Sequence, residues 1–197
     1  MIRIGLTGGI GSGKTTVAKV FQTIGIPVYF SDAKAKLLMS NSEIIRTKLI
    51  EVFGRQSILN NNSINRQFLA AEVFTNQEKL KTLNSIVHPV VRSDFAEWVN
   101  EQKSPYVINE SAILFESGFY KQMEKNIVVL ADEQIRIKRI VLRDKITEKQ
   151  ALERIQNQTD DQTRKKLADY VIFNNNDLIM NQILIIHEKI WGISQNG

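Results

Sequence analysis

The segment GLTGGIGSGKTTV at residues 5–17 places an ammonium group and two hydroxyls directly behind a run of glycines. The pattern G-x-x-x-x-G-K-[ST] is matched by Gly8, Gly13, Lys14 and Thr15. In this pattern, consecutive backbone N–H groups converge on phosphate oxygens, which requires left-handed dihedrals and a close approach that glycine permits. The helix that follows would point its positive N-terminus at the same anion. The segment therefore predicts a phosphate-binding loop.

We expect ATP to be bound by residues of this loop, namely Gly9, Gly11, Ser12, Gly13, Lys14, Thr15 and Thr16. Lys14 would bridge the β- and γ-phosphates, and the hydroxyl of Thr15 would hold Mg²⁺ as the metal ligand. The alternative is a glycine-rich turn with an exposed lysine. A strand-like run before the loop and a helical pattern after it favour phosphate binding.

Two carboxylates follow strand-like runs. Asp32 follows PVYF, a run that we expect to lie beside the first strand, and Glu110 follows PYVIN. Ligands of open parallel sheets bind at the carboxyl ends of the strands. Asp32 could accept a proton from an attacking hydroxyl or contact Mg²⁺ through water, or it could cap the helical segment AKAKLLM. Glu110 could orient Mg²⁺, although its position alone slightly favours a solvated charge at a strand end.

Three arginines in one helical segment have the spacing of a single helix face: Arg136, Arg139 and Arg143. Next to a phosphate-binding loop, such a helix could act as a lid whose arginines close on the transferred phosphoryl group and exclude water. The alternative is an ordinary solvated face, and we favour the lid.

The fold class follows from five short runs that are apolar at consecutive positions: IRIGLT, IPVYF, PYVIN, NIVVLA and DYVIF. Such runs are typical of strands that are buried on both faces of a parallel sheet. Between the first two runs lies an apolar stripe of helical spacing, Val17, Val20, Phe21 and Ile24, with Gly25 as its expected C-cap. We predict an α/β fold, a P-loop NTPase with a five-stranded parallel sheet flanked by helices.

Two helical segments interrupt this pattern. Residues 31–100 contain no convincing strand, and we expect helices capped by Ser63 and Asn76 and a further helix that begins at Pro89. The second segment covers residues 132–167 and contains a possible capping box formed by Thr147 and Gln150.

We therefore expect one domain, residues 1–197, made of three parts. The core comprises about residues 1–30, 101–131 and 168–197, with a helical insertion at about 31–100 and a second helical insertion, the expected lid, at about 132–167.

The composition limits the partners. The formal net charge of +5 is scattered along the chain, and no basic run interleaved with aromatic residues resembles a base-stacking platform. We expect a polyanionic small molecule and no nucleic acid. The chain has no cysteine and no apolar run of the roughly 18 residues that a membrane span requires, and Met1 leads directly into IRIGLT. We expect a cytoplasmic protein without signal peptide or membrane contact, as a monomer or weak homo-oligomer.

Over nearly its whole length, the sequence resembles the dephospho-coenzyme A kinase family. Similar segments are IGLTGGIGSGKTTVA, SDAKAKLLM, LNSIVHPVVR, ILFE, RIKRIVLRD and LADYVIFNN. The I-x-H-P motif and the R-x-x-x-R-D motif are much more specific than the loop alone. The resemblance implies transfer of the ATP γ-phosphoryl group to the ribose 3′-hydroxyl of dephospho-coenzyme A. It also implies that the core holds ATP and that the insertion holds the acceptor.

The resemblance also implies roles for individual residues. Asp32 matches the catalytic aspartate, which would orient and deprotonate the acceptor hydroxyl. Lys14 would act with Arg139 and Arg143, which close over the γ-phosphate. The acceptor side would be shaped by Arg66, His88 and Glu116.

This sequence departs from the family pattern at four places. Ala112 replaces a proline, Asn65 replaces an acid, and Thr15 replaces the commoner serine while keeping the hydroxyl. The usual N-x-G after the last strand reads NNN at 174–176, which affects the edge of the site that faces the nucleotide base.

Two other functions are compatible with the residues. One is a P-loop kinase for a nucleoside monophosphate or a metabolite hydroxyl. The other is a nucleotide-dependent regulator that binds RNA or DNA through its basic surface, with salt-sensitive affinity. The missing stacking platform and a carboxylate at the acceptor edge count against the second.

Overall fold

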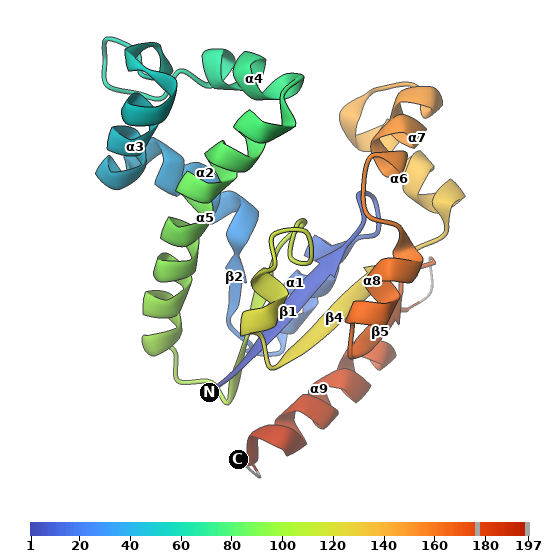
Figure 1. Cartoon of the computed structure of the whole chain (residues 1–197). Helices are drawn as coiled ribbons and strands as arrows, with labels where there is room; N and C mark the ends of the chain where they lie inside the picture. The colour runs from blue at the N-terminus through green and yellow to red at the C-terminus, as the bar shows by residue number, and fades with distance from the viewer. Residues whose placement is uncertain (176–177, 196–197) are drawn as a thin grey trace. The chain divides into compact units, whose positions relative to one another are not determined.

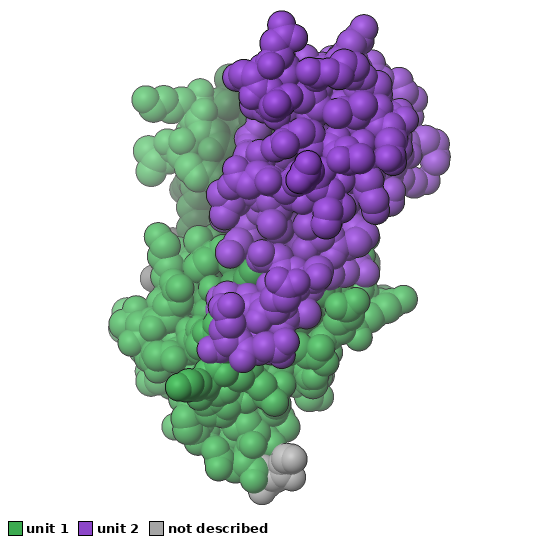
Figure 2. Space-filling model, turned by 90° about the vertical axis from the view of Figure 1, so that its left-hand side faces the viewer, with its two compact units in different colours: residues 1–30, 102–197 green, residues 31–101 purple. Residues whose placement is uncertain are grey.

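The computed structural model describes residues 1–175 and 178–195. The chain divides into two compact units, coloured separately in Figure 2. The first unit comprises Met1–Phe30 and Gln102–Gly197, and the second comprises Ser31–Glu101. Each unit has its own set of helices and is described by itself below.

The first unit is built on a sheet that has five strands within the described residues (Figure 1). The strands are β1 (Ile2–Gly8), β2 (Val28–Phe30), β3 (Tyr106–Glu110), β4 (Lys125–Leu130) and β5 (Tyr170–Phe173). Every pairing is parallel, and the spatial order is β2-β3-β1-β4-β5. The predicted five-stranded parallel sheet is confirmed, because each of the five apolar runs forms a strand. The expected burial on both faces does not hold for the edge strand β5, where Phe173 is exposed.

The prediction that β2 lies beside β1 was wrong. β3 lies between β1 and β2, so that Glu110 is in register with Leu6 on one side and with Phe30 on the other. All five residues of β3 are buried, whereas β2 is a three-residue edge strand. The longer strand, which is buried at every position, takes the interior place in the sheet because it buries more surface there. The carboxylate beside the end of β1 is therefore Glu110.

The helices α1 (Lys14–Thr23) and α9 (Met180–Gln195) pack against one face of the sheet. Phe21 of α1 and Ile183 of α9 share a core with Ile4 and Leu6 of β1. The C-cap of α1 is Ile24, one residue before the predicted Gly25. Gly25 nevertheless helps to end the helix, since it has φ +89° and its N–H donates to Gln22 O at 3.0 Å.

A second, smaller core joins two helices near the phosphate loop. α6 (Glu133–Asp144), α7 (Glu148–Gln156) and α8 (Asp161–Leu167) follow β4, and Figure 1 shows them in yellow to orange. Ile137 and Ile140 of α6 pack with Ala151 and Ile155 of α7. The capping box of α7 is confirmed, with both the Thr147 and the Gln150 hydrogen bonds present. The chain also forms a short 3₁₀ helix, η2 (Phe119–Gln122), before β4.

The second unit is helical, apart from an isolated β-bridge between Ile58 and Ile64. Its elements are α2 (Ser31–Asn41), α3 (Glu43–Phe53), η1 (Arg55–Ser57), α4 (Arg66–Phe74) and α5 (Gln77–Asn100). Asn76 caps α5 as predicted, but Ser63 caps no helix, because α4 begins later and is capped by Asn65.

The prediction that Pro89 begins a helix was wrong. Pro89 lies inside α5, which continues without interruption from Gln77 to Asn100. Proline removes one backbone donor, yet buried side chains both before and after it, such as Val87 and Val91, hold the helix against its neighbours.

Within the described parts of the chain, no helix combines the length and the apolar character that crossing a membrane requires.

Candidate active site

The glycine-rich segment forms a loop between β1, which ends at Gly8, and α1, which begins at Lys14. Gly11 and Gly13 have φ values of +80° and +89°, so the predicted left-handed dihedrals are confirmed at these two positions. Gly13 is the N-cap of α1, and the structure records no side-chain hydrogen bond at this cap among the described residues. The positive end of α1 therefore faces the loop without a capping side chain or an acidic residue in its first turn.

A cavity of about 460 Å³ lies over the loop and the start of α1. The predicted nucleotide-binding residues that line it are Gly9, Gly11, Gly13, Lys14, Thr15 and Thr16. Arg139 and Arg143 of α6 line it as well, together with Ala112 and Gln158, which were not predicted as site residues. Ser12 is buried within the loop instead. The structure thus gathers eight predicted residues of one unit around a single cavity.

Glu110 is a buried carboxylate that contacts two residues of the cavity lining, Lys14 and Thr15. Its Oε1 lies 2.9 Å from Lys14 Nζ and accepts a hydrogen bond from Thr15 Oγ1 at 3.0 Å. The Glu110 side chain is only 4% exposed, so the interpretation as a solvated strand-end charge was wrong. A carboxylate, an ammonium and a hydroxyl are thereby held together at the end of β3 and the start of α1.

These oxygen atoms match the requirements of Mg²⁺. Mg²⁺ commonly binds one or two protein oxygens and completes its octahedron with water and phosphate oxygens. Thr15 Oγ1 and Glu110 Oε1 supply two hard oxygen donors next to each other. The described residues contain no group of three or more His, Cys, Asp or Glu side chains placed to hold a metal ion.

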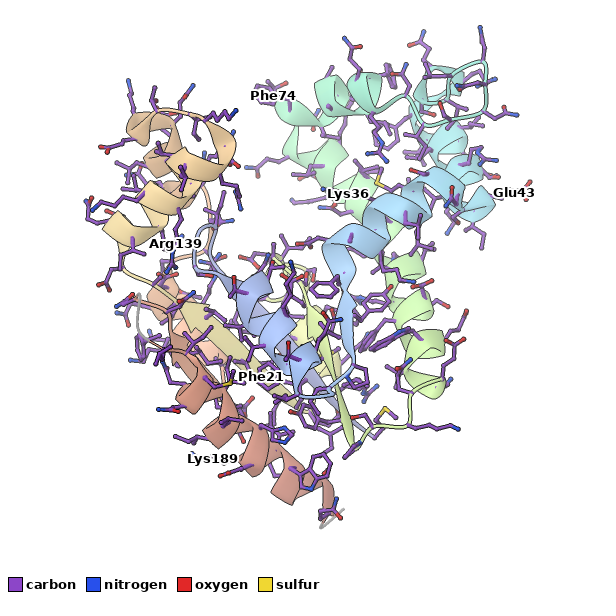
Figure 3. All side chains as sticks on the ribbon, turned by 180° about the vertical axis from the view of Figure 1, so that it is seen from behind. Phe21, Lys36, Glu43, Phe74, Arg139 and Lys189 are labelled. Atoms are coloured by element: carbon purple, nitrogen blue, oxygen red, sulfur yellow. The ribbon has the colours of Figure 1, made fainter. Side chains whose placement is uncertain are left out.

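The outward-facing carbonyls of the loop have donors from α6 and from the end of β5. Arg139 Nη1 donates to Gly11 O at 3.3 Å and to Ser12 O at 3.4 Å (Figure 3 labels Arg139). Asn174 Nδ2 also donates to Ser12 O, at 2.8 Å. Because a trans peptide directs its C=O and N–H to opposite sides, these bonds turn the N–H of Gly13 away from Arg139 and Asn174.

Arg143 lines the same cavity but has a different environment. It is exposed, and its Nε and Nη2 donate to Asp144 at 2.7 and 3.0 Å. Arg154 Nη1 donates to the same carboxylate at 2.7 Å. The hydrogen bonds from Arg143 lower the pKa of Asp144, and the same contact raises the pKa of Arg143.

The three arginines predicted to share one face of α6 differ in position, because Arg139 and Arg143 line the cavity and Arg136 does not. Arg136 does not line the cavity, because it is buried and donates from Nε to Ile10 O at 2.9 Å. The prediction that it belongs to an arginine stripe on a lid surface was therefore wrong for Arg136. Glu116, predicted for the acceptor side, also lies outside the cavity lining and accepts a hydrogen bond from Arg164 Nη2 at 3.2 Å.

The other predicted residues belong to the second unit. Asp32 lies in the first turn of α2, which begins at Ser31, so the helix does not start after Asp32. Arg66 begins α4 and donates from Nη2 to Ser40 Oγ at 2.9 Å. His88 is half-buried on α5, and burial, followed by the charge of Arg92, lowers its pKa. The substrate roles of these residues remain predictions.

Two contacts near the loop involve neutral amides that sequence reasoning did not assign to the site. Gln158 Oε1 accepts from the N–H of Ile10 at 2.8 Å, and Asn174 holds Ser12 as described above. An amide side chain has no charge or reactivity that makes it conspicuous in a sequence. For Asn174 the only signal was the departure at 174–176, of which residue 176 lies outside the described residues.

Comparisons with known proteins agree on one family. The family model described as dephospho-CoA kinase matches residues 2–179. A dephospho-CoA kinase of Porphyromonas gingivalis is 38% identical over 192 residues, which cover 96% of this chain and 95% of that protein.

Two solved structures are similar over nearly the whole chain. The crystal structure of TT1252 from Thermus thermophilus is 31% identical, with a TM-score of 0.82 and coverage of 94% of this chain and 95% of that one. The dephospho-CoA kinase from Campylobacter jejuni is 27% identical, with a TM-score of 0.67 and coverage of 95% and 96%. Since the family model spans most of the sequence and the relatives match it end to end, the chain belongs to the dephospho-CoA kinase family.

Proposed function

We propose that this chain transfers the γ-phosphoryl group of Mg·ATP to the ribose 3′-hydroxyl of dephospho-coenzyme A. The proposal is carried by one observation: in a member of this family, Lys14 and Thr15 meet the buried carboxylate of Glu110 at a cavity lined by the glycine-rich loop. An ammonium, a metal-binding oxygen pair and a helix N-terminus are the groups that hold a triphosphate.

Nucleotide binding uses the positive charge of Lys14, which is paired with Glu110 before the nucleotide binds. Before nucleotide enters, Glu110 neutralises Lys14 at the cavity wall. Phosphate oxygens then compete for the Lys14 ammonium, while Thr15 and Glu110 provide the oxygen donors for Mg²⁺. Bound there, Mg²⁺ would neutralise charge between the β- and γ-phosphates.

Transfer itself depends on position and charge neutralisation, because the phosphoryl transition state is largely dissociative. Arg139 and Arg143 are supported in this role by their place in the cavity lining. Arg143 is the more mobile candidate, since its exposed guanidinium can leave Asp144 for a phosphate oxygen. The helices of 132–167 would then act as the lid.

The acceptor side belongs, in this proposal, to the helical insertion at 31–100. Asp32 orients and deprotonates the 3′-hydroxyl, and Arg66 and His88 contact the acceptor. Glu116, which belongs to the first unit and not to the insertion, is a further acceptor contact in this proposal. Support comes from the family match and from a carboxylate in the first turn after β2. Cytoplasmic location and a monomeric or weakly associating state remain predictions from the sequence.

The direct test is incubation of the purified chain with Mg·ATP and dephospho-coenzyme A, followed by mass spectrometry of the acceptor. We expect a mass increase of one phosphate, localised by fragmentation to the ribose 3′ position. A parallel panel of nucleoside monophosphates and metabolite alcohols tests the other kinases. Phosphorylation of a panel member, with dephospho-coenzyme A unchanged, would overturn the proposed acceptor. Salt-sensitive binding of RNA or DNA without phosphoryl transfer would support the regulator instead.

A further inference from the structure

Ile10, in the middle of the phosphate loop, is contacted through its N–H, its C=O and its side chain. Its N–H donates to Gln158 Oε1 at 2.8 Å, its C=O accepts from Arg136 Nε at 2.9 Å, and its side chain packs on the small core that includes Ile137. All of these partners come from the helical segment after β4. The peptide groups on both sides of this residue are thus anchored from outside the loop.

This anchoring restricts the backbone conformation of the loop. Gly9 and Gly11 flank Ile10, and glycine can adopt many more backbone conformations than other residues. Gly11 already adopts φ +80°. Without external partners, the peptide groups around Ile10 would sample several orientations, and each N–H pointing at phosphate would have to be ordered when nucleotide binds.

Arg136 is itself held by a charge-balanced cluster in which the two arginines are buried and the two carboxylates, Asp161 and Glu116, are 34% and 31% exposed. Its Nη1 lies 2.9 Å from Asp161 Oδ2, and Asp161 Oδ1 lies 3.2 Å from Arg164 Nη1. Arg164 also contacts Glu116 Oε1 at 3.2 Å. The side chains of Arg136 and Arg164 are 5% and 1% exposed. Two guanidinium groups thus meet two carboxylates, so the cluster needs no bound anion for neutrality.

The loop approaches this cluster through its glycines. A Cβ atom on Gly9 would lie 2.5 Å from Arg136 Nη2 and 3.2 Å from Arg164 Nη1. A Cβ atom on Gly11 would lie 2.8 Å from the backbone oxygen of Arg136. Both positions therefore have to be bare for α6 to contact the loop, independently of any phosphate.

We propose that Arg136 is a positioning residue that, together with Gln158, sets the conformation of the phosphate loop through the peptide groups of Ile10. Arg136 does not line the cavity. It acts through the backbone, and it also holds α6, the helix that carries Arg139 and Arg143, against the loop. The catalytic consequence rests on the proposed function, whereas the structural consequence does not.

The test compares Arg136→Lys with Lys138→Gln, an exposed residue on the same helix. Lysine keeps the positive charge facing Asp161 but cannot donate to Asp161 and to Ile10 O with the planar fork of arginine. We expect amide hydrogen exchange across residues 9–13 to accelerate about tenfold or more, and the Kd for Mg·ADP to rise by roughly 10- to 100-fold. The control variant should match the wild type in both measurements.

Thermal unfolding separates positioning from a purely structural role. The expected result for Arg136→Lys is a Tm within a few degrees of wild type together with the faster exchange and weaker binding. Unchanged loop exchange and Kd would overturn the inference, and so would a large loss of Tm with an unchanged Kd. If the lysine variant does not fold, Gln158→Leu removes the acceptor of the Ile10 N–H and must accelerate amide exchange across residues 9–13 in the nucleotide-free protein. Exchange is the deciding measurement for this variant, because Gln158 also lines the cavity and its loss can change the Kd directly.

Neither exchange nor nucleotide binding requires an acceptor. If wild-type protein binds Mg·ADP but leaves dephospho-coenzyme A unphosphorylated, the proposed function fails while the role of Arg136 is still decided by these measurements.

Discussion

Lys14 and Glu110 form an ion pair of 2.9 Å at the cavity wall, although they are 96 positions apart in sequence. The pair joins the first residue of α1 to the last residue of β3. The partner of the loop lysine is therefore set by the order of strands in the sheet.

Removing Lys14 should abolish most of the transfer activity. Lys14→Ala deletes the ammonium that neutralises the phosphates, and we expect kcat to fall by roughly 100- to 1,000-fold. Steady-state kinetics with Mg·ATP measures this loss. Lys19→Ala, an exposed lysine on the same helix, is the matched control and should retain wild-type kinetics. Near-normal turnover of Lys14→Ala would exclude the proposed role.

Glu110→Gln should make nucleotide binding less dependent on Mg²⁺. A purely structural role of Glu110 does not predict this change. The carboxylate repels bare phosphate but attracts Mg²⁺, so its neutralisation should tighten binding of metal-free ATP several-fold and weaken the gain from added Mg²⁺. Calorimetric titrations with excess chelator and with Mg²⁺ provide the two affinities. A uniform weakening under both conditions would instead indicate general damage to the loop.

The same substitution should lower the stability of the nucleotide-free protein. Glu110→Gln removes the carboxylate that pairs with the Lys14 ammonium, at a cost of about 1–3 kcal/mol in the free energy of unfolding. Urea unfolding measures this cost. Saturating ADP should recover part of it beyond the gain seen in wild type, because a phosphate then faces Lys14.

Asp32→Asn should separate chemistry from nucleotide binding. If Asp32 accepts the proton of the acceptor hydroxyl, kcat should fall by roughly 10²- to 10⁴-fold while the Kd for ATP stays the same. Glu43→Gln serves as the control, since Glu43 is an exposed acid in the same unit (Figure 3). Loss of ATP affinity at unchanged kcat would contradict the assignment.

His88 should make stability dependent on pH. Burial lowers the pKa of His88 in the folded state below its ordinary value of 6.5, so the unfolded chain binds the proton more readily. This contribution to the free energy of unfolding is complete above pH 6.5 and is lost as the pH falls through the lowered pKa. Urea midpoints between pH 7.5 and 5 should decline less in His88→Gln than in wild type. Parallel curves for the two proteins would refute this assignment.

Local features of this protein were predictable from local sequence. Gly25 and the capping box of Thr147 act within a few residues, and the apolar runs identified every strand of the sheet. Pro89 is an exception among these local features. Proline usually marks the start or the end of a helix, but here tertiary packing keeps α5 continuous on both sides of it.

The residues by themselves determined the phosphate loop, the parallel α/β fold and the family, because motif spacing and hydrophobic periodicity are properties of neighbouring positions. The tertiary structure alone decided that β3 separates β1 from β2, that Glu110 meets Lys14, and that Arg136 supports the loop from behind. Each of these depends on which distant segments pack together. That choice is made by burial and charge pairing summed over the whole unit, and no short window of sequence contains it.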